Sequence, residues 1–379
     1  MKLQFGFFLW CLFESTSCFS FPAEIVKITL GDGEVLTGRV ALPEESSQIR
    51  QLIIYVNSSG PHTYLDQRKA GNKEFNYFDV FAEEFTKRGI AFFSYSRRGV
   101  YLGNKPPFYD SIDTEKYKKY MPEIEHDDLL EVIKYLKRDK RFRKSKVVLL
   151  GWSEGTVLAT LVAAQKKSGV DALLLAGYCN DRMLDIIKWQ HSGEPTVRFH
   201  GQFFDKNEDD TITRSEYQSS EDRASRYRAN ALRNTPFETF DVNKDTLLTK
   251  EDFALMAKPK LDALMQAYEK QDDAWIWNNY FRVTSAWIKA HDALEPNSSR
   301  MLRLDIPIFI FQGTHDANTS VAGVHDIDRR FKEAGKKNLS IHTFKYYDHD
   351  LNFAQWVVRG TESEGISKML EVAVALMKQ

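Results

Sequence analysis

The stretch that most constrains the fold is residues 147–155, V-V-L-L-G-W-S-E-G, in which four apolar residues run directly into a Gly-x-Ser-x-Gly motif. Such a continuous apolar run is typical of a strand buried on both faces of a sheet. The small residues at 156–164 predict a following helix. Glycines on both sides of the serine relieve crowding where the chain turns sharply and lifts the hydroxyl above the sheet edge. Ser153 is therefore a candidate nucleophile, the alternative being a serine in a surface turn.

Elsewhere, strand-like and helix-like segments alternate along the 379 residues, a length that can bury a full core. A hairpin is predicted at 25–42, strands at 52–56, 90–95, 172–176, 306–311 and 339–346, and helices around 78–85, 129–136, 324–331 and 366–373. This alternation predicts an α/β fold with a mostly parallel, doubly wound sheet covered by helices on both faces.

More than a hundred residues between the strands at 172–176 and 306–311 have a different character. They carry many charges, four tryptophans and no convincing buried strand. A compact α/β domain does not contain so long a structureless loop, so we expect an inserted, mainly helical cap. The predicted organisation is a signal peptide at 1–20, a first part of the α/β core at 21–180, the cap at 181–299 and a second part of the core at 300–379.

Residues 1–20 have the layout of a secretory signal, with a basic residue, an apolar run and then small polar residues. The apolar run is too short to span a bilayer comfortably, and a buried N-terminal strand is the alternative. Cys18 is a possible site of lipid modification, although the residues before it match that signal poorly. After cleavage only Cys179 would remain of three cysteines, which excludes an internal disulfide.

We therefore expect an exported protein, either secreted or held in the periplasm or cell envelope. No later stretch is long and apolar enough to cross a membrane. The formal net charge of -1 gives no electrostatic argument for nucleic-acid binding.

A serine nucleophile needs a base to take its proton and a carboxylate to orient that base. Asp316 follows the strand at 306–311, and His349 follows the last strand. Sites in open α/β sheets lie at the carboxyl ends of strands, so both side chains should reach Ser153. Asp316 could instead cap the next helix, His349 could be an ordinary loop histidine, and His315 is a competing base.

The reaction also needs two N–H donors aimed at the oxyanion. One is expected from the backbone of Glu154, directly after the nucleophile, and the other from Ser59 or Gly60 in the loop after the strand at 52–56. An ordinary turn is the alternative for that loop.

With these elements in the order Ser, Asp, His, the chain resembles the α/β-hydrolase-fold serine hydrolases. Residues 57–61, N-S-S-G-P, are similar to the H-G-S-G-P loop of a bacterial esterase and dienelactone-hydrolase-like branch. The sequence departs from that loop at Asn57 and Ser58, and Ser59 matches the oxyanion position. The resemblance covers roughly 22–180 and 300–379 but not the insertion. It implies hydrolysis of a small-molecule ester, thioester or amide through an acyl-enzyme.

The insertion holds a repeated pattern of oxygen ligands that resembles a pair of EF-hand calcium loops. The first loop offers Asp205, Asn207, Asp209, the backbone of Thr211, and Glu216; the second offers Asp241, Asn243, Asp245, the backbone of Leu247, and Asp252. Both loops have an apolar residue at position 8, as paired loops require. The alternative is a structural relic with solvated carboxylates.

Position 6 of an EF-hand loop normally holds glycine because the turn needs a positive φ. Here it holds Asp210 and Thr246. Aspartate tolerates this geometry better than β-branched threonine. Asp252 at position 12 is also shorter than Glu216, so we expect Ca²⁺ in the first loop more than in the second, and no organic cofactor.

A group of aromatic residues lies where the insertion returns to the sheet, namely Trp275, Trp277, Tyr280, Phe281 and Trp287. They could line an acyl pocket or form the core of the cap. The sequence as a whole predicts an exported serine hydrolase acting on carboxylic esters, with a calcium-stabilised cap. A serine peptidase acting on short peptides and an inactive calcium-dependent binding protein are the alternatives.

Overall fold

The computed structural model describes residues 21–44, 49–70, 72–106 and 108–378. The predicted signal segment at 1–20, with Cys18, lies outside these residues. The centre of the molecule is an eight-stranded sheet in the order β1-β2-β6-β3-β9-β10-β13-β14. Its strands are β1 (Ala23–Thr29), β2 (Val35–Ala41), β3 (Gln51–Val56), β6 (Ala91–Tyr95), β9 (Lys146–Trp152), β10 (Ala172–Ala176), β13 (Ile308–Gly313) and β14 (Leu339–Phe344).

Only the first two pairings of this sheet are antiparallel, β1 with β2 and β2 with β6. From β6 onward the strands run parallel. This order, with one antiparallel hairpin leading into a crossed-over parallel sheet, is that of the α/β-hydrolase fold, so the predicted fold class is confirmed. Every residue of β3, β6 and β10 is buried, which explains why these strands are apolar except at Gln51 and Ser94.

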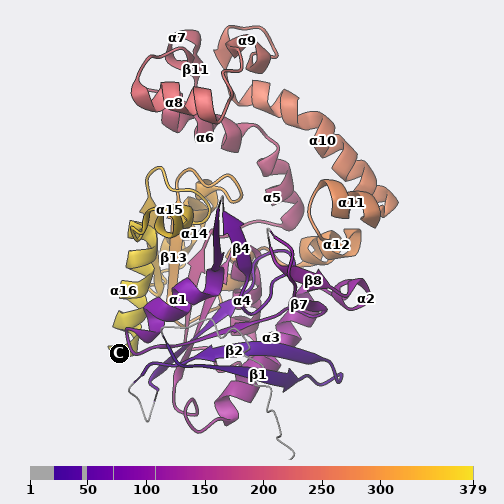
Figure 1. Cartoon of the computed structure of the whole chain (residues 1–379), viewed down its shortest axis with the longest axis vertical. Helices are drawn as coiled ribbons and strands as arrows, with labels where there is room; N and C mark the ends of the chain where they lie inside the picture. The colour runs from indigo at the N-terminus through magenta and orange to yellow at the C-terminus, as the bar shows by residue number, and fades with distance from the viewer. Residues whose placement is uncertain (1–20, 45–48, 71, 107, 379) are drawn as a thin grey trace, which may run out of the picture.

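Helices cover both faces of the sheet (Figure 1). One apolar layer contains side chains from α3 (Pro122–Arg138), α4 (Glu154–Ala164) and α14 (Val321–Glu333). The opposite layer contains side chains from α1 (Tyr77–Thr86), α15 (Phe353–Arg359) and α16 (Glu364–Lys378). Two short hairpins and one short helix extend the core: β4 (Gln67–Ala70) with β5 (Lys73–Asn76), β7 (Val100–Leu102) with β8 (Asp110–Ile112), and α2 (Thr114–Tyr117).

The segment between β10 and β13 is mainly helical and stands above the carboxyl ends of the strands (Figure 1). Its elements are α5 (Met183–Gln190), α6 (Glu194–Phe204), β11 (Ile212–Thr213), α7 (Arg214–Tyr217), α8 (Asp222–Asn230), α9 (Phe237–Phe240), β12 (Leu247–Leu248), α10 (Lys250–Lys270), α11 (Asp273–Asn279), α12 (Ser285–Ala293) and α13 (Asn297–Met301).

The insertion has two apolar centres. The distal one packs the aromatic residues around the two predicted calcium loops, including Phe204, Tyr217 and Phe253. The proximal one joins insertion residues such as Trp287 to Tyr120 of the core. The proximal part of the cap is therefore fastened to the core, and α10 connects it to the distal part (Figure 1).

No helix within the described ranges is long and apolar enough to cross a bilayer. Cys179, at the end of β10, is buried and free.

Candidate active site

Ser153 occupies a strained turn between β9 and α4, with φ 56° and ψ -123°. A positive φ in a residue other than glycine typically costs about 1–3 kcal/mol and is retained where the surrounding structure enforces it. Its amide donates to the carbonyl of Ala176 at 2.9 Å, which ties the turn to the neighbouring strand. The turn also explains both flanking glycines. A Cβ at Gly151 would lie 2.4 Å from the carbonyl oxygen of Gly155, and one at Gly155 would lie 2.3 Å from that of Val56.

Asp316 and His349 are brought together from the ends of adjacent strands β13 and β14. The distance from His349 Nδ1 to Asp316 Oδ2 is 2.8 Å. The other carboxylate oxygen, Oδ1, accepts the backbone N–H groups of Asn318 and Thr319 at 2.7 and 2.9 Å. Gln312 also donates to Asp316 Oδ2 at 2.7 Å. With its carboxylate so fixed, Asp316 both caps the local turn and orients the imidazole.

The electrostatics of this pair follow from burial and mutual attraction. Burial alone would lower the pKa of His349, but the Asp316 carboxylate raises it to about 9. Burial would in turn raise the pKa of Asp316, yet the charge and hydrogen bond of His349 hold it below its ordinary value. The pair is therefore built to carry an imidazolium beside a carboxylate.

Gly177, directly after β10, provides the space for the imidazole. Its φ is +57°, and a Cβ there would lie only 2.5 Å from His349 Cε1. The indole N–H of Trp152 donates to the carbonyl of His349 at 3.0 Å and fixes its backbone. The histidine is thus held on two sides by the strands next to the nucleophile.

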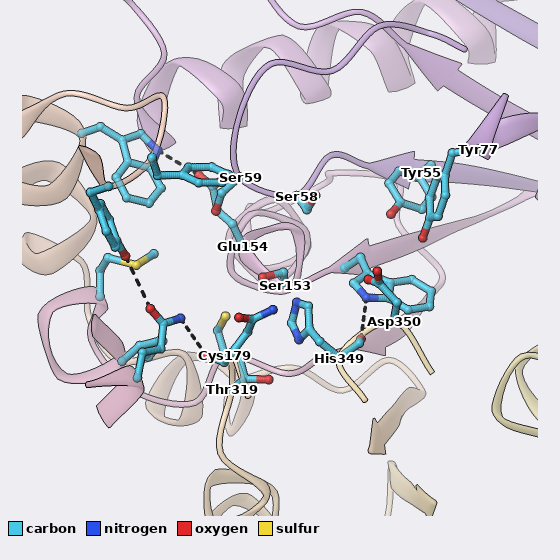
Figure 2. Close-up of a pocket in the computed structure, with 18 of the residues that line it drawn as sticks. Tyr55, Ser58, Ser59, Tyr77, Ser153, Glu154, Cys179, Thr319, His349 and Asp350 are labelled. Atoms are coloured by element: carbon cyan, nitrogen blue, oxygen red, sulfur yellow. Dashed lines mark hydrogen bonds between the residues drawn. The ribbon is translucent and has the colours of Figure 1, made fainter. Parts of the chain in front are cut away.

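A cavity of about 340 Å³ lies over the elbow. Four of the predicted site residues line it, namely Ser153, His349, Ser59 and Glu154, and Asp316 stands behind His349. Figure 2 shows Ser153 close to His349 in the middle of this cavity. His315 lies in another cavity, and burial lowers its pKa to about 4. Its position excludes it as the base for Ser153.

The predicted oxyanion loop at 57–61 is held by two side chains. Asn57 donates to the carbonyl of Tyr95 at 3.2 Å. The buried Arg97 donates to the carbonyls of Ser58, at 2.9 Å, and Gly60. These bonds fix the loop although its first two residues differ from the H-G-S-G-P pattern that it resembles.

The carboxylate of Glu154 is a feature that the sequence did not reveal. It is buried and accepts from Trp287 Nε1 at 3.1 Å, lies 2.6 Å from His291 Nε2, and also bonds the hydroxyl of Tyr120. Burial acts to raise its pKa, but the charge and hydrogen bond of His291, with Arg97 nearby, hold it at about 2. Glu154, which follows the candidate nucleophile, therefore anchors helix α12 of the cap.

The aromatic residues of the insertion serve both expected roles, and Tyr280 and Trp287 serve both at once because they line the cavity and also belong to the proximal apolar centre. Tyr280, Phe281 and Trp287 line the active-site cavity. Trp275 and Trp277 pack against the proximal apolar centre. The cap consequently supplies an apolar wall facing the nucleophile.

The first predicted calcium loop has a backbone conformation in which its sixth residue, Asp210, takes φ +61°. Its amide donates to Asp205 Oδ2 at 2.9 Å, and the amide of Thr211 donates to Asp209 Oδ1 at 2.9 Å. Glu216 at position 12 accepts the amides of Lys206 and Thr213. Asn207 donates to Asp209 at 2.7 Å.

The second loop repeats this arrangement. The amide of Thr246 donates to Asp241 Oδ2 at 3.2 Å, and that of Leu247 to Asp245 Oδ1 at 2.9 Å. Asn243 donates through its backbone to Asp252 Oδ1 at 3.1 Å. The two loops pair through β11 and β12, with Ile212 opposite Leu248. Thr246 adopts φ +74° despite its branched side chain, so this loop is strained at position 6, as its sequence indicates.

The donor chemistry of these loops fits a hard cation. Among the described residues, no three His, Cys, Asp or Glu side chains converge into a compact metal cluster. EF-hand loops, however, also use amide and backbone oxygens, and they supply these at positions 3 and 7. Asp241 Oδ1 is buried without a hydrogen-bond partner among the described residues, which a cation in the second loop would satisfy.

The first loop also touches the core. Glu208, in its fourth position, accepts from Lys345 Nζ at 2.7 Å and from the Tyr346 hydroxyl at 2.6 Å. Lys345 and Tyr346 begin the loop that carries His349. The predicted calcium site is therefore in direct contact with the segment that holds the candidate base.

No model of a known protein family matches the sequence, and no curated protein matches it. Solved structures similar to this chain include an esterase of Pyrococcus furiosus (13% identity, 93% of this chain and 92% of the other, TM-score 0.46). An α/β hydrolase of a Penicillium species is similar at 14% identity, over 93% and 99% of the chains, with TM-score 0.48. An acylaminoacyl peptidase of Pyrococcus horikoshii is similar at 10% identity, over 94% of this chain but 41% of its own, with TM-score 0.48. Similarities at this level carry no inference about activity, and the fold assignment rests on the strand order.

Proposed function

We propose that this protein is a serine hydrolase that cleaves carboxylic esters and thioesters through an acyl-enzyme. The proposal depends on one observation: Ser153, on its strained turn, and His349 line the same cavity. The Nδ1 atom of His349 is in turn bonded to the buried Asp316. Residues 57–61 of this chain resemble the oxyanion loop of the esterase and dienelactone-hydrolase-like branch of this fold.

The geometry assigns a role to each group. With the Nδ1 proton of His349 directed to Asp316, the Nε2 atom is left to accept the proton of Ser153 as its oxygen attacks the carbonyl carbon. The backbone N–H groups of Ser59 and Glu154 stabilise the resulting oxyanion. His349 then protonates the departing alcohol or thiol, and the acyl group stays on Ser153. Water, activated by the same imidazole, releases the acid.

The test is turnover of 4-nitrophenyl and thioester substrates by the purified chain and by Ser153→Ala. We expect Ser153→Ala to lose at least about 10³-fold in kcat while keeping its melting temperature. Ser340→Ala, which alters an exposed serine of the outer strand β14, is the matched control and should retain turnover. Equal turnover by Ser153→Ala and the wild type would refute the assignment. Amide substrates with the same acyl groups distinguish an esterase from a peptidase.

We further propose that the insertion is an EF-hand-like pair that binds Ca²⁺. Both loops place their sixth residue at positive φ and pair through β11 and β12. A ligand bound only by the native state must raise the melting temperature. We therefore expect Ca²⁺ to raise it relative to a chelator, and an Asp205→Asn, Asp241→Asn double variant to lose this shift. An unchanged melting temperature would remove calcium from the account.

Export also belongs to the proposal, since residues 1–20 have the composition of a secretory signal. N-terminal sequencing of protein expressed in its host should find a chain that begins near residue 21. Intact Met1 would contradict export by this route.

A further inference from the structure

A second cavity, of about 450 Å³, lies beside the active-site cavity. The two cavities share three lining residues, Cys179, Ile186 and Thr319. Figure 2 shows Cys179 and Thr319 on one side of Ser153 and His349. We call this second cavity the acidic annex. It lies between α5 of the cap and α14 of the core, so a substrate held at Ser153 has the annex next to it.

The annex is lined by an excess of negative charge. Four carboxylates, those of Asp181, Asp185, Glu194 and Asp326, face one guanidinium, that of Arg330.

Two of these carboxylates already have cationic partners. Asp326 pairs with Arg330 at 2.7 Å, and Glu194 pairs with Arg198 at 3.3 Å. Neither Asp181 nor Asp185 takes part in an ion pair within the described part of the chain. Burial and the charges of Asp326 and Asp185 raise the pKa of Asp181 more than the Asn180 hydrogen bond and the charge of Arg330 lower it. The excess of carboxylates over cationic side chains in the annex therefore favours the binding of a positive charge.

Buried polar atoms without partners provide a second, independent observation. Three residues that line the annex, Tyr178, Asn180 and Trp189, each have a buried polar atom with no hydrogen-bond partner in the described residues. The side chain of Asn180 is a clear case because the residue is only 5% exposed. Its amide group donates to Asp181 at 3.0 Å and to Asp326 at 3.3 Å, which leaves its Oδ1 as an unused acceptor.

Unpaired buried polar atoms are costly and rare, and a ligand that supplies the missing partner removes the cost. The acceptors here are the buried Asn180 oxygen and the two exposed carboxylates of Asp181 and Asp185, a set that suits a ligand with several N–H donors and a positive charge. The indole of Trp189 is also a favourable neighbour for a cation.

We propose that the acidic annex binds a protonated primary amine of the substrate, so that the enzyme prefers esters carrying an alkylammonium group. This inference rests on the proposed ester hydrolysis at Ser153, and it names the substrate class of that site. A primary ammonium satisfies acceptors through its N–H groups, whereas a trimethylammonium cannot. The expected order of preference is therefore primary ammonium, trimethylammonium, then the uncharged isostere.

The test compares 4-nitrophenyl 6-aminohexanoate with the heptanoate, and 6-aminohexyl butanoate with heptyl butanoate, because the amine could sit on either side of the ester. In one of the two pairs, we expect kcat/KM for the cationic ester to exceed that for its neutral counterpart by about tenfold at low salt. This ratio should fall as the ionic strength rises. Asp181→Asn and Asp185→Asn should each reduce this ratio by about fivefold. Asp328→Asn, which removes an exposed carboxylate of α14 paired with Lys332, is the matched control and should leave the ratio unchanged. A ratio of one or less for both pairs, or a ratio that the two annex variants do not alter, would overturn the inference.

A binding measurement separates this inference from the proposed function. Calorimetric titration with hexylammonium, and with hexanol as the neutral control, needs no turnover. If no ester is hydrolysed, the proposed function fails, and hexylammonium binding that is lost in Asp181→Asn still supports the annex. If neutral esters are hydrolysed but hexylammonium does not bind, the annex is wrong and the hydrolase stands.

Discussion

Replacing Asp316 with asparagine should change both the rate and the pH dependence of the enzyme. In the native protein Asp316 raises the pKa of His349 to about 9, against an ordinary value of 6.5. This difference corresponds to about 3 kcal/mol of stabilisation of the imidazolium, or a factor of roughly a few hundred. The imidazolium forms during the attack of Ser153, so kcat should fall by at least this factor in Asp316→Asn. An amide that turns its N–H₂ toward Nδ1 would also favour the wrong tautomer and deepen the loss.

The pH profile gives the sign of the effect. Only the neutral imidazole acts as a base, so kcat/KM of the wild type should rise with pH through a midpoint near 9. Without the carboxylate, burial favours the neutral form, and the midpoint should fall to 6.5 or below.

The free energy of unfolding also depends on the protonation of this pair. The contribution of the imidazolium is complete below pH 6.5 and is lost as the pH rises through about 9, because the folded pKa of His349 is the raised one. The contribution of the Asp316 carboxylate is lost on acidification, because its folded pKa is the lowered one.

The assay is kcat/KM between pH 5 and 10 with a fluorogenic acyl ester, corrected for spontaneous hydrolysis. Asp350→Asn is the comparison, because its charge makes a smaller contribution to the pKa of His349 than that of Asp316. Its midpoint should move much less. A wild-type midpoint in Asp316→Asn, or a fall in its kcat of less than about tenfold, would contradict the role assigned to Asp316.

Three further substitutions test other parts of the structure. Gly177→Ala should lower kcat at least about 10²-fold, because its Cβ would displace the imidazole of His349, whereas Gly360→Ala, with φ +71° and open space around it, should lower only stability. Glu154→Gln should lower the free energy of unfolding by about 3 kcal/mol above pH 4.5. This contribution is lost as the pH falls through about 2, so the unfolding free energies of variant and wild type, measured in urea, should become equal in strong acid. Thr246→Asn should raise the unfolding free energy by about 1 kcal/mol in thermal or urea melts, because asparagine tolerates the positive φ at that position; a lower stability would contradict the strain.

The sequence was informative where local pattern and topology act together. The apolar run before Ser153 predicted a buried strand, and the two glycines around Ser153 predicted a sharp turn after it. Asp316 and His349 follow strands that lie side by side in a parallel sheet, so their approach follows from strand order alone. The apolar residues at position 8 of the two loops likewise predicted the pairing of β11 with β12.

Features that depend on packing between distant segments could not be predicted. Glu154 and His291 are separated by 137 positions, and no periodicity links a helix of the cap to the residue after the nucleophile. The acidic annex likewise forms only when α5 packs over α14. The sequence also could not show which aromatic residues of the insertion face the cavity, because Trp277 and Trp287 both occur in amphipathic helical patterns.

Covalent labelling shows whether Ser153 is an activated nucleophile. The purified protein should react with a fluorophosphonate probe, and mass spectrometry of the digested product should find the adduct on the peptide that contains Ser153. Labelling should disappear in Ser153→Ala. The absence of an adduct on folded wild-type protein, or an adduct on a different serine, would contradict the account and favour a binding protein built on a hydrolase scaffold.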